Sequence, residues 1–337
     1  HAAAYAAISM QTAYLKANYP LEFAVGLLTS VMDDSKKLMK YVTSFRQTGV
    51  NILPPDVTKS EYGFSIETDD DGNESIRFGL FAIKGVGEDV ANTIPAERAK
   101  QPYKDIDDFV KRHMSFNRKA FENLAKAGAF DAFGHTRQTL VENFDTMLTS
   151  IKTQAKNYDE NQLTLFDFGL DVDTSYKFNE YPEYSYLQKC RNEKDATGMY
   201  VSGHPASTIE NITKKNGAVN IEDIVSENSI YHNDDEVAIG GVITEIKKNI
   251  TKKGNIMMII DVEDTTGHIS VLLFEHAIQK FQSELNEDGL IFLKGKVRGG
   301  GEDSSLILQT VCPLKDTPSI LWLSLIHISE PTRPEPI

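Results

Sequence analysis

The stretch GLFAIKGVGEDVANTI, residues 79 to 94, decides the fold of the first half of this chain. It begins with an apolar run that we interpret as a helix ending at Ile83 and Lys84. Gly85-Val86-Gly87 follow, and a new helix is predicted to begin near Glu88. Glycine adopts backbone conformations that other residues avoid and lets the backbone approach a neighbouring molecule closely. The pattern therefore predicts two helices joined by a tight turn.

This order of elements is the helix-hairpin-helix pattern, and it suggests a ligand. The first N–H groups of the second helix point outward, where the helix dipole favours an anion. Such contacts hold the sugar-phosphate backbone of duplex DNA without reading bases, and Lys84 would add a salt-sensitive charge. Lys84, Gly85, Val86 and Gly87 are therefore candidate DNA-binding residues. The alternative is a helical turn with a glycine cap and no ligand.

A second copy of the pattern follows in NRKAFENLAKAGAFDAFG, residues 117 to 134. We predict a helix from Arg118 to Lys126 that stops at Gly128. Two hairpins hold a duplex from both sides better than one does, so Arg118 and Lys119 become candidate DNA ligands, with Arg112 as a further basic candidate. Each of the three can equally serve only to solvate a helix face.

From Glu236 to about Pro313 the pattern changes to five short strands, with a helical stretch between the third and the fourth. This layout predicts an OB-fold barrel. EIKKNITKKGN, residues 245 to 255, is predicted to be the turn between the first two strands. A basic loop beside a barrel face suits single-stranded nucleic acid, although such lysines can also serve only solubility. The candidates are Lys247, Lys248, Lys252 and Lys253.

Aromatic side chains that could stack on bases are few in this region. They are Phe274 and Phe292, and either can belong to the barrel core. The prediction of a barrel is accordingly more specific than the prediction of a nucleic-acid ligand.

Between these two regions lies a polar, turn-rich segment that displays the pentapeptide QLTLF, residues 162 to 166. Gln162, Leu163, Leu165 and Phe166 match a known type of short peptide ligand for DNA sliding clamps. Leucine and phenylalanine anchors fill a hydrophobic pocket while the glutamine makes polar contacts at its rim. Chance matches are common, and such a segment can also dock on its own protein.

Composition sets the limits of the interpretation. With 337 residues, 40% hydrophobic and 25% charged, the chain is expected to be soluble, to form two or three domains and to contain no membrane span. The net charge of -14 argues against a protein coated in nucleic acid but permits local basic patches. Cys190 and Cys312 form no CxxC pair, which is consistent with a reducing cytoplasm.

Several segments together resemble one family, the alpha subunits of bacterial DNA polymerase III of the DnaE type. The resemblance covers residues 1 to about 313. The segments that carry it are HAAAYA (1–6), LPPDV (53–57), IRFGLFAIKGVG (76–87), LAKAGAFD (124–131), QLTLF (162–166) and TGMYVSGHP (197–205).

The resemblance implies a multidomain α+β chain. Its expected parts are the end of the fingers domain with a β-hairpin (1–75), a tandem helix-hairpin-helix region that binds duplex DNA (76–155), a linker with the clamp-binding peptide (156–180), a helical connector (181–235) and an OB-fold domain (236–316). Residues 321–337 are Pro-rich and abrupt, and we expect them to be a non-native tail.

The resemblance also implies what the chain does and what it lacks. The parent enzyme extends primers on a DNA template, using palm aspartates that hold Mg2+. No acidic cluster here aligns with that palm motif, and the opening HAAAYAAISM looks like the middle of a helix. We therefore expect a carboxy-terminal fragment without catalytic residues, metal ligands or polymerase activity of its own. Its expected partners are duplex DNA, the sliding clamp, single-stranded template and other replisome subunits.

Two alternatives remain at the level of the sequence. One is a repair or recombination accessory protein that carries the same DNA-binding modules. The other is a hydrolase with DNA-binding appendages, but the chain contains no nucleotide-binding glycine loop, no HExxH and no GxSxG. His204 is predicted to be a structural turn residue. His1 either approaches the incoming nucleotide or packs within a helix.

Overall fold

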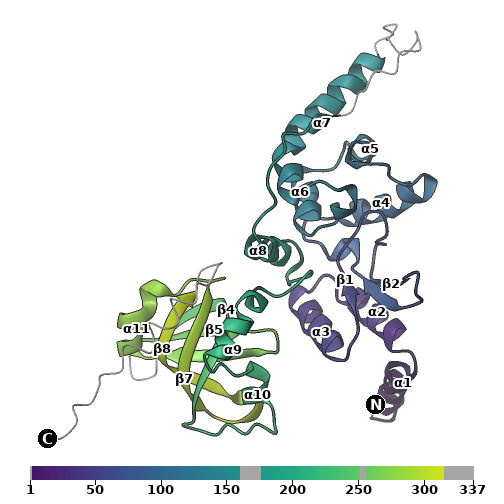
Figure 1. The fold of residues 1–337 in the computed structure, drawn as a ribbon. Coiled ribbons are helices and arrows are strands. Elements are labelled where there is room, and N and C mark those ends of the chain that lie inside the picture. The colour runs from purple at the N-terminus through teal and green to yellow at the C-terminus, as the bar shows by residue number, and fades with distance from the viewer. Residues whose placement is uncertain (1, 160–175, 251–255, 315–337) are drawn as a thin grey trace, which may run out of the picture. The chain divides into compact units, whose positions relative to one another are not determined.

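The computed structural model describes residues 2–159, 176–250 and 256–314, and it divides the chain into two compact units, His1–Ser202 and Gly203–Ile337. The first unit is mostly helical and contains a small sheet, and the second is built around a five-stranded barrel (Figure 1). The predicted class, α+β with an OB-fold barrel, is confirmed.

Three helices open the first unit: α1 (Ala2–Asn18), α2 (Pro20–Ser30) and α3 (Ser35–Gln47). Pro20 is the first residue of α2, where its missing N–H removes no helical hydrogen bond. The cap of α3 is Asp34, whose side chain accepts a hydrogen bond from the Lys37 amide at 3.1 Å.

A three-stranded sheet follows, formed by β1 (Ile52–Leu53), β2 (Ser65–Thr68) and β3 (Glu74–Arg77) in the order β1-β3-β2. Strands β2 and β3 form the predicted antiparallel hairpin. Its acidic turn is closed by Asp69, which accepts hydrogen bonds from the amides of Asp71 and Asn73, while Gly72 has a positive φ of 84°. The side chain of Asp69 therefore stabilises the turn.

The rest of the first unit consists of η1 (Leu80–Ala82), α4 (Glu88–Lys100), α5 (Ile106–Arg112), α6 (Arg118–Lys126), η2 (Asp131–Phe133), α7 (Arg137–Asp159) and α8 (Tyr186–Thr197). One hydrophobic core joins these elements to α2, α3 and the sheet, with Leu28, Phe78, Phe109, Phe121 and Phe130 among its fully buried side chains. The predicted fingers end and hairpin region therefore share a core.

The prediction of a helix that ends at Ile83 and Lys84 is wrong in one respect. The segment before the turn is only the short 3-10 helix η1. The amides of Leu80 and Phe81 donate to the carbonyls of Glu61 and Tyr62 at 3.0 Å each. Because these N–H groups bind a distant segment, they cannot belong to a longer preceding helix.

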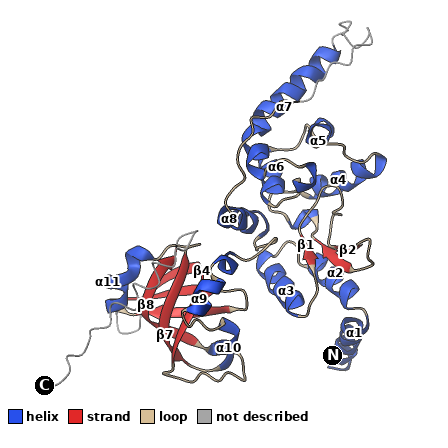
Figure 2. Cartoon of the chain, viewed as in Figure 1, coloured by secondary structure: helices blue, strands red, loops and turns tan. Residues whose placement is uncertain are grey.

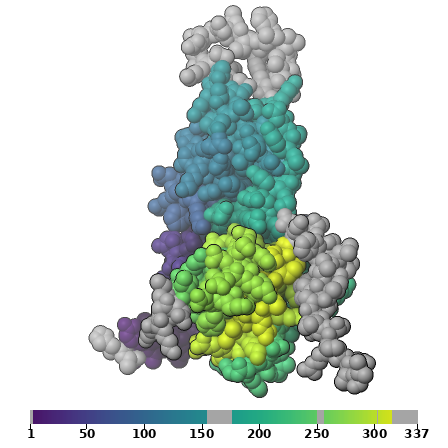
Figure 3. Space-filling view, turned by 90° about the vertical axis from the view of Figure 1, so that its left-hand side faces the viewer, coloured from purple at the N-terminus to yellow at the C-terminus, as the bar shows by residue number. Residues whose placement is uncertain are grey.

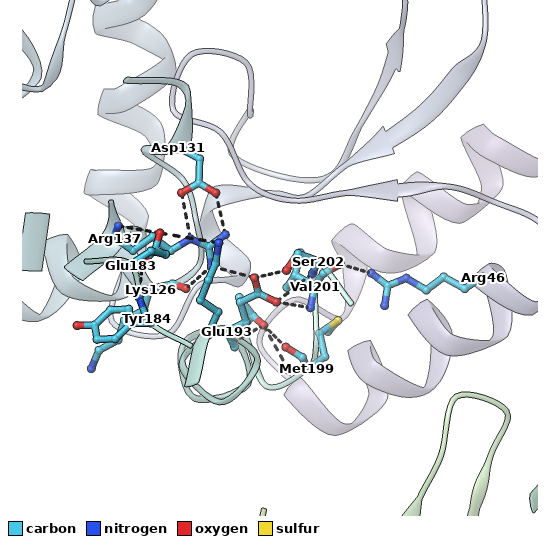
Figure 4. A network of polar contacts seen from close by, with 12 residues as sticks. Arg46, Lys126, Asp131, Arg137, Glu183, Tyr184, Glu193, Met199, Val201 and Ser202 are labelled. Atoms are coloured by element: carbon cyan, nitrogen blue, oxygen red, sulfur yellow. Dashed lines mark hydrogen bonds and ion pairs between the residues drawn. The ribbon is translucent and has the colours of Figure 1, made fainter. Parts of the chain in front are cut away.

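Polar side chains hold α7, α8 and the segment after α8 together (Figure 4). Arg137, 3% exposed, donates to Glu193, which is fully buried, at 2.9 Å, and to Asp131 at 2.8 Å. Glu193 also accepts hydrogen bonds from the amides of Val201 and Ser202 and from the Ser202 hydroxyl. Both buried charges therefore have partners for their hydrogen-bonding groups.

The second unit begins with η4 (Pro205–Thr208), α9 (Glu210–Lys215) and α10 (Ile221–Val225) and continues as a closed barrel (Figure 2). Its strands are β4 (Glu236–Ile250), β5 (Ile256–Glu263), β6 (His268–Leu273), β7 (Leu290–Arg298) and β8 (Ser305–Leu314), in the order β4-β5-β6-β8-β7.

The barrel closes through a parallel pair, β6 with β8, and an antiparallel pair, β7 with β4. The predicted helix between the third and fourth strands is α11 (Glu275–Phe281), followed by η5 (Gln282–Glu284), and η6 (Gly301–Asp303) joins β7 to β8. Ile278 and Phe281 of α11 and Ile221 of α10 complete the barrel core. Figure 3 shows the surface of this unit, whose residues are coloured green to yellow.

His113, buried in the first unit, makes stability depend on pH. Its Nε2 lies 2.7 Å from the hydroxyl of Tyr103, which itself donates to the Ile94 carbonyl at 2.8 Å. Nε2 must therefore carry the proton, and Nδ1 has no partner within the described residues. Burial, and then the nearby charge of Arg112, lowers the pKa of His113 to about 4.

A folded-state pKa of about 4, against an ordinary value of 6.5, means that the unfolded chain binds more protons between these pH values. The stabilisation is complete above pH 6.5 and is lost as the pH falls toward 4. We expect His113→Phe to reduce the fall in the free energy of unfolding between pH 7.5 and 5 by roughly 2 kcal/mol. Urea denaturation at the two pH values measures this. An equal fall in both proteins would contradict the assignment.

Candidate nucleic-acid interface

The turn between η1 and α4 is exposed where a ligand would need it. Gly85 and Gly87 are exposed, whereas Val86 is 4% exposed and its amide donates to the Ile83 carbonyl at 3.1 Å. Gly85 has φ +80°, a left-handed conformation that favours glycine. Gly87 is the N-cap of α4 and offers no side chain to its amides. Val86 therefore anchors the turn and the two glycines face outward.

Contacts from two distant helices hold the backbone of Lys84. Its amide donates to the Ala196 carbonyl of α8 at 2.7 Å, and its carbonyl accepts from Nδ2 of Asn123 on α6 at 2.5 Å. The side chain of Lys84 is exposed. The side chain of Lys84 therefore projects from a backbone whose amide and carbonyl are both hydrogen-bonded. Neither contact was predicted, because nothing in local periodicity indicates which side chain meets a distant carbonyl.

Lys119, predicted from the second motif, lies beside the turn of the first. A Cβ added to Gly85 would lie 3.2 Å from Cγ of Lys119 and 3.3 Å from Nδ2 of Asn123. Lys119 is exposed, and within the described residues neither Lys84 nor Lys119 forms an ion pair. The structure therefore brings the two motifs together on one surface with two uncompensated positive charges.

The arginines predicted beside them are already engaged. Arg118 forms ion pairs with Glu122 at 2.6 Å and with Asp145. Arg112 donates to the carbonyl of Gln101 at 2.8 Å and to that of Glu97, and its guanidinium lies 4.5 Å from the ring centroid of Tyr103. Arg112 therefore supports the fold, while Arg118 is half exposed in weak surface pairs.

Negative charge lies close to the turn as well. Glu88 and Asp89 occupy the first turn of α4 and are exposed. Carboxylates there interact favourably with the helix dipole, and they repel a phosphate approaching the same amides. Positive charge from nearby residues such as Lys84 and Lys119 would therefore have to outweigh this repulsion for DNA to bind at the turn.

In the barrel unit, the predicted position of two lysines is wrong. Lys247 and Lys248 lie within β4, which extends to Ile250, because they pair in register with Ile259 and Met258 of β5. The ammonium of Lys247 lies 2.7 Å from Glu245 and 3.6 Å from Asp261, and the Glu245 carboxylate raises its pKa. Lys252 and Lys253 lie outside the described residues.

The other predicted positions divide between core and surface. Phe292 is 3% exposed and belongs to the core, whereas Phe274 is 43% exposed. His204 caps η4 by accepting the Ala206 amide on Nδ1 at 3.1 Å, which is the structural role predicted for it. His1 and the peptide Gln162, Leu163, Leu165 and Phe166 lie outside the described residues.

Within residues 2–159, 176–250 and 256–314, no group of three or more His, Cys, Asp and Glu side chains is arranged to hold a metal ion. None of the helices there combines the length and apolar character that a membrane span requires.

Comparison with known proteins identifies both regions. The family described as "Helix-hairpin-helix motif" matches residues 49–140, and the one described as "OB-fold nucleic acid binding domain" matches residues 237–311. DNA polymerase III subunit alpha of Bacillus subtilis is 35% identical over 320 residues, which is 94% of this chain. The subunit of Thermus aquaticus is 33% identical over 333 residues, or 97% of this chain.

This chain is homologous to part of DNA polymerase III subunit alpha. It spans 27% of the Bacillus protein and 26% of the Thermus protein, or about a quarter of each. Within the part of this chain that these relatives match lie its helix-hairpin-helix and OB-fold regions. A mitochondrial single-stranded DNA-binding protein from S. cerevisiae, Rim1, is similar to 25% of the chain at 14% identity and a TM-score of 0.22.

Two glycines with the same backbone conformation allow the crowding at the turn to be tested. Gly85 and Gly72 have φ values of +80° and +84°, but only at Gly85 would an added Cβ meet Lys119 and Asn123. We expect Gly72→Ala to lower the free energy of unfolding by about 1 kcal/mol through backbone strain alone. Gly85→Ala should lower it further, because these two side chains must also move.

Chemical denaturation of the two variants measures the difference. Equal losses in the two variants would show that α6 does not crowd the turn.

Proposed function

We propose that this chain is the DNA-holding portion of a bacterial replicative DNA polymerase III alpha subunit, acting in the cytoplasm. Its first unit would grip the backbone of duplex DNA, its linker would bind the sliding clamp, and its barrel would hold single-stranded template. The homology over 94% of the chain supports this assignment over a repair or recombination accessory protein.

The observation that carries the duplex-binding proposal is the exposed turn with lysines on both sides. Gly85 and Gly87 leave room for a phosphate, and Lys84 and Lys119 provide positive charge without a carboxylate partner among the described residues. Neutralising phosphates releases counterions, so binding of this kind weakens as salt rises. Arg118 would contact DNA only by replacing its ion pairs with surface carboxylates by an ion pair with phosphate. This exchange costs little because exposed ion pairs are weak.

The barrel contributes less charge than its lysine count implies. Lys247 is offset by Glu245 and Asp261, so Lys248, Lys252 and Lys253 remain as the proposed contacts to a single strand. Phe274, exposed at the start of α11, is the aromatic side chain available for stacking on a base.

Primer extension and the Mg2+ ions that it requires belong to the parent polymerase in this proposal. Among the described residues, no group of three or more His, Cys, Asp and Glu side chains is arranged to hold a metal ion. The role of this chain would be to position the duplex and to connect the polymerase to the clamp and to other replisome subunits.

Duplex binding is tested by titrating the chain into labelled duplex DNA and measuring fluorescence anisotropy at several salt concentrations. We expect Lys84→Ala and Lys119→Ala each to weaken binding and to reduce the slope of log affinity against log salt by about 0.9. Glu88→Gln with Asp89→Asn should strengthen binding, because the repulsion between these carboxylates and phosphate is removed.

Lys280→Ala on α11 is the matched control, because it removes an exposed positive charge from the other unit. If the unaltered chain failed to bind duplex even at low salt, the proposed function would be wrong.

The clamp proposal has a separate test. Purified sliding clamp should be captured by the chain, and Leu165→Ala with Phe166→Ala should abolish capture, because these side chains are the hydrophobic anchors. Duplex affinity should be unchanged in this double variant. Undiminished capture would remove the assignment of residues 162–166.

A further inference from the structure

We infer that Asn123 is a positioning residue for the DNA-binding turn, and that the end of α8 is the second half of the same support. This inference rests on the proposed duplex-binding function. Asn123 would contribute no charge and make no DNA contact. It would act by holding the backbone from which Lys84 and the glycines are presented.

The turn has few hydrogen bonds of its own. The Val86 amide bonds to the Ile83 carbonyl, and the conformation of Gly85, φ +80°, is otherwise one of several that glycine can adopt. The two polar backbone groups of Lys84 bind outside the turn, to Asn123 and to Ala196. Two contacts with helices distant in sequence therefore select one conformation for a segment that local forces leave open.

Asn123 is well placed for this task because α6 is itself held firmly. Asn117 caps the helix by accepting the Ala120 amide at 2.7 Å, and Phe121 and Leu124 are buried in the core. The side-chain amide of Asn123 donates to the Lys84 carbonyl beside Gly85, where an added Cβ would lie only 3.3 Å from Nδ2 of Asn123. Gly85 and Asn123 therefore form a matched pair.

The other contact comes from the last turn of α8, where carbonyls have no acceptor role inside the helix. The Ala196 carbonyl accepts the Lys84 amide, while the helix ends at Gly198 in a left-handed cap that bonds to the Lys194 carbonyl. Glu193, on the same helix, is held by Arg137 of α7. The TGMY segment at 197–200 thus ends the helix that supports the turn.

Removing the amide of Asn123 has an effect that removal of a lysine cannot mimic. Asn123→Ala keeps every charge, so the number of counterions released on binding is unchanged. The affinity should fall about fivefold, because the turn must be ordered during binding at the expense of one hydrogen bond. Lys119→Ala should instead change both the affinity and its salt dependence.

The experiment measures duplex affinity over a salt series for the unaltered chain, Asn123→Ala, Gly85→Ala, Lys119→Ala and the double variant Asn123→Ala/Gly85→Ala. We expect a parallel salt slope for Asn123→Ala. The double variant should bind little more weakly than Gly85→Ala, because each change alone disturbs the same contact between Asn123 and the turn. In the absence of DNA, the Lys84 amide should exchange faster in Asn123→Ala than in the unaltered chain. The amides of the hydrophobic core should exchange at unchanged rates.

Asn216→Ala is the matched control, since it removes a side-chain amide that donates to the Ile212 carbonyl at 2.8 Å in the barrel unit. If the unaltered chain does not bind duplex, the proposed function fails. If it binds and Lys119→Ala weakens it, unchanged affinity in Asn123→Ala overturns the inference alone. Additive losses in the double variant, or faster exchange throughout the core, would also overturn it.

Discussion

The buried ion pair between Arg137 and Glu193 is the interaction on which the first unit depends. Burial alone would lower the pKa of Arg137, but the carboxylates of Asp131 and Glu193 raise it, so the guanidinium stays charged. A buried pair stabilises only when its remaining polar groups also find partners. Here the amides of Val201 and Ser202 bind Glu193, and the pair thereby joins α7, α8 and the segment after α8.

This constraint reaches the proposed DNA-binding surface through a short series of contacts. Glu193 holds α8 in place, the Ala196 carbonyl of α8 holds the Lys84 amide, and Asn123 holds the Lys84 carbonyl. Because α2, α3 and the hairpin helices share one core, the support does not depend on a single loop. A turn that contains two glycines can then combine exposure with a defined conformation, which lowers the entropy lost when a ligand binds.

The predictions that the structure confirms rest on local features of the sequence. The bounds of α6 and the order of five strands with one inserted helix follow from apolar period, caps and turn residues. The predictions were wrong where contacts with residues distant in sequence determine the secondary structure. Leu80 and Phe81 give their amides to residues 61 and 62, so η1 replaces a helix. Pairing with β5 extends β4 through Lys247 and Lys248.

The same distinction explains how the proposed DNA-binding surface is compatible with a chain of net charge -14. Counting basic residues treats Arg112, Arg118, Lys84 and Lys119 alike. The structure separates them, because Arg112 bonds to backbone carbonyls and Arg118 pairs with Glu122, whereas the two lysines beside Gly85 have no carboxylate partner in the described residues. Counterion release depends on charges that can reach phosphate. In the proposed function, affinity at this turn would therefore depend on which positive charges the fold leaves uncompensated, and the carboxylates of Glu88 and Asp89 in the first turn of α4 would limit it.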